Sequence, residues 1–315
     1  MRELAGVDEA GLGPILGPLV VAGVGLQLPP DVTPWRALRA IVSKSRNEPR
    51  KLRVDDSKKV NQGEHGFVRL EECVLSFWTA WRGALPPTLG ALLSDLGADH
   101  WLPTECPWYR ELDVALPLQA DAGAVELLAH RLARAMRGAE LQLSAIAARI
   151  VDAKEFNELV DESDNKSRTH LQVYSEVIDA ILHQVGDGAE ITADRCGGLM
   201  RYQAALEELW PEAQIRVVTE TSRRSAYDVS ARGRTARLSF DVGADARSFP
   251  TALASCVAKY LRETLIDRLN RWFCDRVPGL LPTAGYYTDG QRFVREVAAL
   301  MRREALPSDL LVRSR

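Results

Sequence analysis

The sequence predicts an α/β fold, with a mixed β-sheet flanked by helices. Short apolar, strand-like runs alternate along the chain with longer segments of helical periodicity, which is typical of α/β proteins. The first two strand-like runs also follow each other directly, as expected for an antiparallel hairpin. The chain has 315 residues, of which 46% are hydrophobic and 26% charged, so it can bury a substantial core.

Six runs of apolar or alternating residues are expected to form strands. The first, from Leu4 to Asp8, leads into a turn rich in glycine and proline, and the second carries a Val20-Val21 pair. In the last run, Ala236 and every second residue after it share one apolar face. The expected strands cover residues 4–8, 18–26, 141–151, 190–193, 214–219 and 235–242.

The remaining periodic segments are expected to be helices. The longest has Pro250 in its first turn, a position that proline favours, and another follows Gly197-Gly198 and ends at Trp210. The other helices are expected over 61–81, 122–137, 170–185 and 289–303, with the longest over 250–274. Residues 83–120 lack periodicity and predict a loop or irregular insertion. Residues 152–164 carry six acids against one lysine and predict a solvated loop and helix edge.

Charge and cysteine content exclude several classes of protein. Lysine and arginine number 40 against 43 acidic residues, a net charge of -3, so binding to nucleic acid would need a local basic groove. Five cysteines without a CxxC pair argue against a disulfide framework or zinc module and favour the cytoplasm. The charge-free run from residue 10 to 30 contains Pro14 and Pro18, so we expect a turn and a buried strand there, not a membrane span.

Four acidic residues stand where apolar strands or turns meet helices: Asp8, Glu9, Asp194 and Asp245. If the sheet brings them together, they form an all-oxygen site, which suits Mg²⁺ or Mn²⁺ and supports two-metal phosphoryl hydrolysis. For any one of them alone, a helix cap or turn acid is the commoner role.

The residues around these acids resemble the ribonuclease HII family, the type 2 ribonucleases H. Gly6-Val7-Asp8-Glu9-Ala10-Gly11-Leu12-Gly13-Pro14 is similar to the opening motif of that family, and Asp56-Ser57-Lys58-Lys59 to its Asp-Ser-Lys-Lys loop. Asp194 follows a short strand, as the family's third acid does. The run from Gly243 to Lys259 resembles the segment around the fourth acid, and Gly285-Tyr286-Tyr287-Thr288 the Gly-Tyr-Gly-Thr motif.

The resemblance implies a fold, a reaction and a set of roles. It implies a ribonuclease H-like catalytic domain over residues 1–275, with insertions at about 83–140 and 202–241, and a C-terminal helical extension over 276–315. It implies hydrolysis of the RNA strand of RNA–DNA hybrids, or of ribonucleotides embedded in DNA. Separately from the resemblance, we expect a cytoplasmic monomer. The four acids would hold Mg²⁺ or Mn²⁺. The residues implied to bind substrate are Gly11, Leu12, Gly13, Ser57, Lys58, Lys59 and Tyr286.

The sequence departs from the family at the opening turn, where the usual Gly-Arg-Gly reads Gly11-Leu12-Gly13. The absence of that arginine removes a phosphate contact and bears on cleavage at single ribonucleotides. Membership of the HII or the HIII branch stays open, and Asp241 is a rival to Asp245 for the role of fourth acid.

The second predicted insertion has a charge signal of its own. Between Thr221 and Ser239 the chain carries five arginines against one aspartate, so a hairpin that binds phosphate backbones through residues such as Arg223 and Arg224 is one interpretation. A solvated, salt-bridged hairpin is the other. The five arginines are Arg223, Arg224, Arg232, Arg234 and Arg237.

Two other functions stay open at this point. A non-catalytic nucleic-acid-binding relative of ribonuclease HII would keep the fold, and a phosphoesterase for small substrates would need neither a basic arm nor a stacking tyrosine. The five histidines show no metal-ligand spacing, so we expect them at the surface or at helix caps. Glu263 is expected to pair with Lys259 one helical turn away.

Overall fold

The computed structural model describes residues 1–98, 105–231 and 233–313. Its centre is a seven-stranded sheet with the order β5-β2-β1-β6-β9-β8-β7. The strands are β1 (Arg2–Ala10), β2 (Leu19–Leu28), β5 (Gln142–Val151), β6 (Ala189–Asp194), β7 (Gln214–Glu220), β8 (Arg224–Ala231) and β9 (Arg234–Asp241). A separate parallel pair joins β3 (Val42–Ser43) to β4 (Leu52–Arg53).

The sheet is mixed. β1 forms the predicted antiparallel hairpin with β2, and β2 continues antiparallel to β5. On its other side β1 runs parallel to β6, and β6 parallel to β9, whereas β8 and β7 return antiparallel. The predicted fold class, a mixed sheet flanked by helices, is therefore confirmed.

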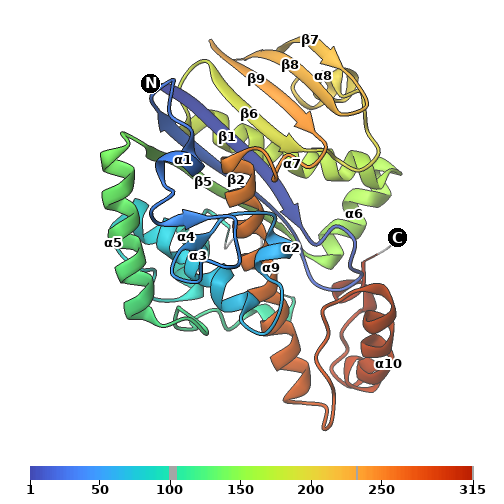
Figure 1. Cartoon of the computed structure of the whole chain (residues 1–315). Helices are drawn as coiled ribbons and strands as arrows, with labels where there is room; N and C mark the ends of the chain where they lie inside the picture. The colour runs from blue at the N-terminus through green and yellow to red at the C-terminus, as the bar shows by residue number, and fades with distance from the viewer. Residues whose placement is uncertain (99–104, 232, 314–315) are drawn as a thin grey trace.

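Helices cover both faces of this sheet, as Figure 1 shows with α9 in front and α7 behind. On the α9 side lie α1 (Pro34–Ala37), α2 (Ser57–Val60), α3 (Gly66–Arg82), α4 (Leu89–Asp95), α5 (Ala122–Gly138) and α9 (Phe249–Cys274). On the other side lie α6 (Ala153–Ser163), α7 (Lys166–Gln184) and α8 (Gln203–Leu209). The last long helix is α10 (Tyr287–Arg303), and short 3-10 turns cover Pro107–Tyr109 and Ser308–Leu310.

Each face of the sheet has its own apolar core. In β1, Ala5 and Val7 pack toward α7, whereas Ala10 packs toward α9, as the alternation of strand side chains requires. β2 is buried on both faces, which explains why its sequence is a nearly continuous apolar run. The longest helix, α9, begins where its proline predicted, with Ser248 capping the backbone N–H of Thr251.

Two expectations about irregular segments are wrong in part. Within 83–120 the chain forms α4, capped by Thr88, and buries Trp108 against the rings of Trp272 and Phe273. Residues 99–104, inside the same segment, lie outside the described residues. The acidic stretch at 152–164 is mostly the helix α6, because Asp152 caps its first turn and Phe156 buries its inner face.

The C-terminal segment returns to the start of the chain. The carbonyl of Gly285 accepts hydrogen bonds from the backbone N–H groups of Ile15 and Leu16, at 2.8 and 3.2 Å. Close to the end, the N–H of Arg313 donates to the Ile15 carbonyl at 2.9 Å. The turn after β1 is therefore held between α9 and the C-terminal segment.

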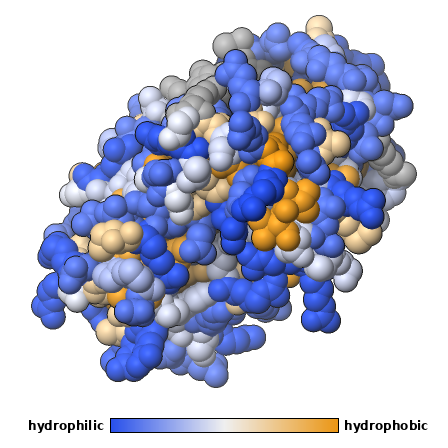
Figure 2. Space-filling model, turned by 90° about the horizontal axis from the view of Figure 1, so that it is seen from above, coloured by the Kyte–Doolittle hydropathy of each residue, from blue (hydrophilic) through white to orange (hydrophobic). Residues whose placement is uncertain are grey.

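Among the described residues, no helix is long and apolar enough to cross a bilayer. Figure 2 shows one face that is mostly hydrophilic, with a compact hydrophobic group near its middle.

Candidate active site

The parallel strands β1, β6 and β9 end side by side, and an aspartate stands at the end of each. Val7 pairs with Ala193, so Asp8 and Asp194 follow as neighbours, and Asp194 is in register with Asp241. Residues paired across parallel strands point to the same face, here the one covered by α9. The row of carboxylates comes from strands far apart in the sequence.

Asp245 joins this row from the loop after β9. The backbone N–H of Ala244 donates to Asp194 Oδ1 at 2.8 Å, which folds the loop over the end of β6. Burial raises the pKa of Asp194, and the negative charges of Glu9 and Asp245 raise it further. Asp245 is thus close enough for its negative charge to act on Asp194.

Asp8 is the most deeply buried of these acids, with 6% of its surface exposed. Burial, followed by the charges of Glu9 and Asp194, raises its pKa well above the usual range, and a hydrogen bond with Ser255 opposes the rise. Carboxylates that repel one another in a buried place are costly unless a cation or hydrogen bonds compensate.

Glu9 lies on the opposite face of β1, since neighbouring residues of a strand alternate. Its Oε2 accepts a hydrogen bond from the Tyr174 hydroxyl and lies 3.6 Å from His170 Nε2. Burial alone would raise the pKa of Glu9, but His170 and Tyr174 outweigh it and hold the pKa at about 2. Glu9 is therefore a carboxylate that stays charged beside the more easily protonated Asp8.

The Asp-Ser-Lys-Lys loop lies against the same edge. Asp56 caps α2 by accepting from the Lys58 N–H at 2.9 Å, and the Ser255 hydroxyl donates to the Ser57 hydroxyl at 2.9 Å. Ser57, implied to bind substrate, is buried and linked through Ser255 to Asp8. The charge of Asp56 raises the pKa of Asp245, which burial has already raised.

The two lysines of this loop are exposed. Lys59 Nζ lies 3.7 Å from Asp55 and 3.8 Å from Asp56, and its positive charge lowers the pKa of Asp245. Lys58 points to solvent.

The opening turn is fixed by buried groups. Gly11 has φ +97°, and an added Cβ would come within 2.5 Å of Arg262 Nε and of the Pro18 carbonyl. Gly13 is exposed and has nothing within 4 Å of such a Cβ. Leu12 packs on the apolar core of the α7 side, so the turn presents no cation of its own. Tyr286, half-exposed, follows the glycine that holds this turn.

Part of the predicted arginine hairpin lies at the site and part does not. The turn between β7 and β8 lies at the acidic edge, because Arg224 is in register with Asp241 and Arg195 donates to the carbonyls of Thr221 and Ser222. Arg224 and Arg247 lie 3.6 and 3.9 Å from Asp241. We name Arg195, Arg223, Arg224 and Arg247 the arginine rim.

The other hairpin arginines lie at the opposite end of the sheet. Arg237, in register with Glu190, shares Asp228 with Arg216. Arg234 donates to the carbonyls of Leu182, His183 and Val185 at the end of α7, a capping role. Arg232 lies outside the described residues.

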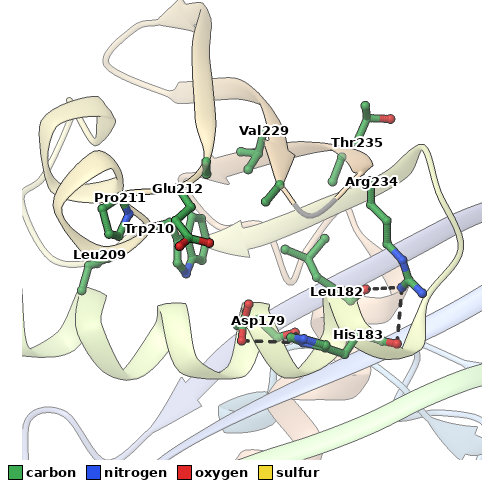
Figure 3. Close-up of a pocket in the computed structure, with 13 residues that line it drawn as sticks. Asp179, Leu182, His183, Leu209, Trp210, Pro211, Glu212, Val229, Arg234 and Thr235 are labelled. Atoms are coloured by element: carbon green, nitrogen blue, oxygen red, sulfur yellow. Dashed lines mark hydrogen bonds and ion pairs between the residues drawn. The ribbon is translucent and has the colours of Figure 1, made fainter.

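An open pocket of about 550 Å³ lies beside these carbonyls, between α7, the loop after α8 and strands β8 and β9 (Figure 3). Trp210, Glu212, Asp179 and Arg234 line it, and none of the four acids predicted for the active site does. We therefore take the acidic edge, not this pocket, as the candidate active site.

Sequence reasoning missed His170 and Tyr174. The sequence predicts this histidine at the surface or at a cap, but it is 1% exposed and lies beside Glu9. The signal available was their spacing of four residues on α7, which places both on one helix face. Glu263 is, as expected, the partner of Lys259, at 2.6 Å.

All donors of the four acids are oxygens, which suits a hard divalent cation, and burial together with neighbouring carboxylates raises the pKa values of Asp8 and Asp194. Asp241 Oδ1, also buried here, has no hydrogen-bond partner among the described residues, and Arg224 Nε lies 3.6 Å from it. Over the part of the chain that the structure describes, however, no three His, Cys, Asp or Glu side chains are arranged as ligands of one ion. Glu9, turned toward Tyr174, stands apart from the others.

No family model matches the chain, and no curated protein matches it in sequence. Similar solved structures include ribonuclease HII of Archaeoglobus fulgidus in its complex with PCNA, with 18% identity, a TM-score of 0.43, and coverage of 99% of this chain and 94% of that one. Ribonuclease H2 of Pyrococcus horikoshii has 14% identity, a TM-score of 0.45 and coverage of 98% and 92%. Bst-RNase HIII in complex with Mn²⁺ has 14% identity, a TM-score of 0.42 and coverage of 99% and 66%. Likenesses at this distance concern the fold and do not assign an activity.

Proposed function

We propose that the chain is an endoribonuclease that hydrolyses the RNA strand of RNA–DNA hybrids, or ribonucleotides embedded in DNA. The observation that carries the proposal is the meeting of Asp8, Asp194 and Asp245 at one edge of the sheet, with their pKa values raised by burial and by neighbouring acidic side chains. Motifs similar to those of type 2 ribonucleases H surround Asp8 and Asp245, and Asp194 follows a short strand, as the third acid of that family does.

In this proposal, Asp8, Glu9, Asp194 and Asp245 hold Mg²⁺ or Mn²⁺. When bound, the ions supply an activated water and neutralise the charge that develops on the leaving oxygen. Phosphodiester hydrolysis needs little covalent chemistry from the protein, so the chain contributes mainly by positioning the ions and the substrate and by electrostatics.

Different residues around the acids are assigned to different parts of the nucleic acid. Lys58, Lys59 and the arginine rim flank the acidic edge from two sides and are assigned to backbone phosphates. The backbone at Gly13, exposed in the turn that follows β1, is assigned to the 2′-hydroxyl that distinguishes RNA from DNA. Tyr286 offers a ring on which a base or sugar can stack regardless of sequence.

A second candidate function is a nucleic-acid-binding relative without catalysis. Two observations favour it: Leu12, partly buried against the core, stands in place of a turn cation, and Glu9 is turned toward α7. This protein would bind hybrids through the same rim and lysines.

The two functions are separated by incubating a labelled RNA–DNA hybrid with the protein and Mg²⁺ or Mn²⁺. We expect cleavage by the wild-type protein and a loss of at least about 100-fold in Asp194→Asn, because the amide cannot supply the negative charge. The amide oxygen still accepts the hydrogen bond from Ala244, so folding and hybrid binding in EDTA should persist.

Asp187→Asn is a matched control. Asp187 also accepts a backbone hydrogen bond, from Thr235 at 2.7 Å, but at the opposite end of β6. Its activity should equal that of the wild type. Hybrid binding without any cleavage by the wild type would favour the non-catalytic relative, and full turnover by Asp194→Asn would remove the proposed metal site.

A further inference from the structure

The face of β1 opposite Asp8 carries a compact polar cluster inside an otherwise apolar core. Glu9, His170 and Tyr174 compose it, and the two rings lie 4.7 Å apart at nearly a right angle. His170 is 1% exposed and Tyr174 0%, so both are removed from solvent. The aliphatic neighbours on α7, such as Leu171 and Ile178, belong to the core of this side.

The local sequence of α7 places these two side chains. Asn165 caps the helix by accepting from the N–H groups of Ser167 and Arg168, which fixes where the helical phase begins. His170 and Tyr174 are one helical turn apart and therefore face the same way, toward the end of β1.

His170 is an unusual buried group. Among the residues that the structure describes, Nδ1 has no hydrogen-bond partner, and Nε2 has a long contact with Glu9 Oε2, at 3.6 Å. A buried polar group without a partner costs about 1–3 kcal/mol, so its retention points to a role beyond packing. Nε2 of His170 faces Glu9 Oε2 at 3.6 Å. The same oxygen accepts the hydrogen bond from the Tyr174 hydroxyl.

We propose that His170 and Tyr174 are positioning residues that together hold Glu9 Oε2 on α7 and leave Oε1 as the oxygen that Glu9 offers to a divalent ion. The proposal rests on the proposed function, since it concerns how one of its four carboxylates is presented. Groups that hold a metal-binding carboxylate or imidazole by hydrogen bonds set metal affinity, and their removal typically costs 10–100-fold.

The test compares Tyr174→Phe, His170→Leu and His170→Gln with the wild type. Mn²⁺ binding to the protein without nucleic acid is measured by calorimetry or by the loss of free Mn²⁺ signal in electron paramagnetic resonance. We expect Tyr174→Phe and His170→Leu to weaken Mn²⁺ binding about tenfold or more, and His170→Gln, which keeps a side-chain donor, to recover most of the affinity.

Two further readouts separate positioning from a structural role. Hybrid affinity in EDTA should stay within twofold of the wild type in all three variants. In cleavage, kcat should fall while KM for the hybrid stays constant. His183→Gln, on the same helix but exposed, is the matched control and should match the wild type throughout.

Tyr174→Phe removes one hydroxyl and keeps the ring, so it tests the proposal even if His170→Leu does not fold. Wild-type Mn²⁺ affinity in Tyr174→Phe and His170→Leu, with cleavage by the wild-type protein intact, would overturn this inference alone. A wild-type protein that neither binds Mn²⁺ nor cleaves the hybrid would overturn the proposed function and this inference with it.

Discussion

Neighbouring residues of the candidate site differ in charge state because a strand points them to different layers. Asp8 faces α9, where burial and nearby carboxylates raise its pKa, whereas Glu9 faces α7, where Tyr174 and His170 hold its pKa at about 2. One is easily neutralised and the other stays ionised. Two adjacent acids can therefore contribute differently to the same anionic edge, as their surroundings dictate.

The two glycines of the opening turn also differ. Gly11→Ala should lower the free energy of unfolding by at least about 2 kcal/mol, since its φ of +97° disfavours a side chain and the new Cβ would clash with Arg262 and Pro18. Gly13→Ala has open space and should change stability by less than about 0.5 kcal/mol. Urea denaturation followed by circular dichroism measures both.

If the Gly13 backbone approaches the substrate as proposed, Gly13→Ala should raise KM for the hybrid severalfold at unchanged stability, because Cβ would keep the ligand away. An unchanged KM would remove Gly13 from the proposed substrate-binding residues. A stable Gly11→Ala variant would contradict the strain assigned to the turn.

At the scale of elements, the strands β8 and β9 separate the hairpin arginines into two groups. Arg223 and Arg224 lie at the acidic edge, and Arg216 and Arg237 lie toward the other end, paired with Asp228. The sequence window over residues 221–239 counts Arg223, Arg224 and Arg237 as one basic patch. The sheet register shows that only the first group can reach a substrate bound at the carboxylates.

The double variant Arg223→Gln/Arg224→Gln should therefore weaken hybrid binding severalfold and reduce the salt slope of log K by about 1–2, roughly one unit for each phosphate that the protein no longer neutralises. Arg216→Gln/Arg237→Gln removes the same charge and should leave the slope unchanged. Fluorescence anisotropy in EDTA over a series of salt concentrations measures the hybrid affinity and its salt slope. Equal slopes for both double variants would show that the rim does not bind the phosphate backbone.

The elements predicted correctly are those with local signals. The β1–β2 hairpin and α9 follow from short-range periodicity and from a proline at the helix start. Helix α4 was missed because prolines and glycines around it hide a short helix that its cap and its burial stabilise. The alignment of Asp194 with Asp241 depends on pairing between distant strands, and no spacing in the sequence determines it.

The same limit applies to the candidate site. Its four acids could be proposed because they lie next to glycines or at the ends of predicted strands. That they form one site was implied by the family resemblance. The role of His170 could not be predicted, because a single histidine in a helical segment does not indicate which residue it contacts across the core. Burial distinguishes it from the exposed His183, which also lies 3.6 Å from a carboxylate.

Across the whole molecule, segments near both ends of the chain build the surface beside the acids. The opening turn is held by Gly285 and Arg313, and its carbonyl at Gly11 accepts from the Arg313 guanidinium. Arg313 is buried and also lies over the Phe156 ring, so it supports the turn from inside the protein and does not face a ligand. Cations that can reach a phosphate lie instead on the Asp-Ser-Lys-Lys loop and the arginine rim.

This distribution predicts a preference among substrates. With Leu12 partly buried against the core, the turn next to the acids gives no ionic contact to the phosphate at a single ribonucleotide. Recognition then depends on several 2′-hydroxyls and on phosphates farther along the duplex. We expect kcat/KM for a long RNA–DNA hybrid to exceed that for a duplex with one ribonucleotide by at least about tenfold, in parallel assays with matched length and sequence. Leu12→Arg should reduce the ratio of the two kcat/KM values if the new guanidinium reaches solvent. Thermal melting checks that the variant remains folded. Equal cleavage of both substrates by the wild type would mean that the turn needs no cation, and that its backbone alone recognises the ribonucleotide.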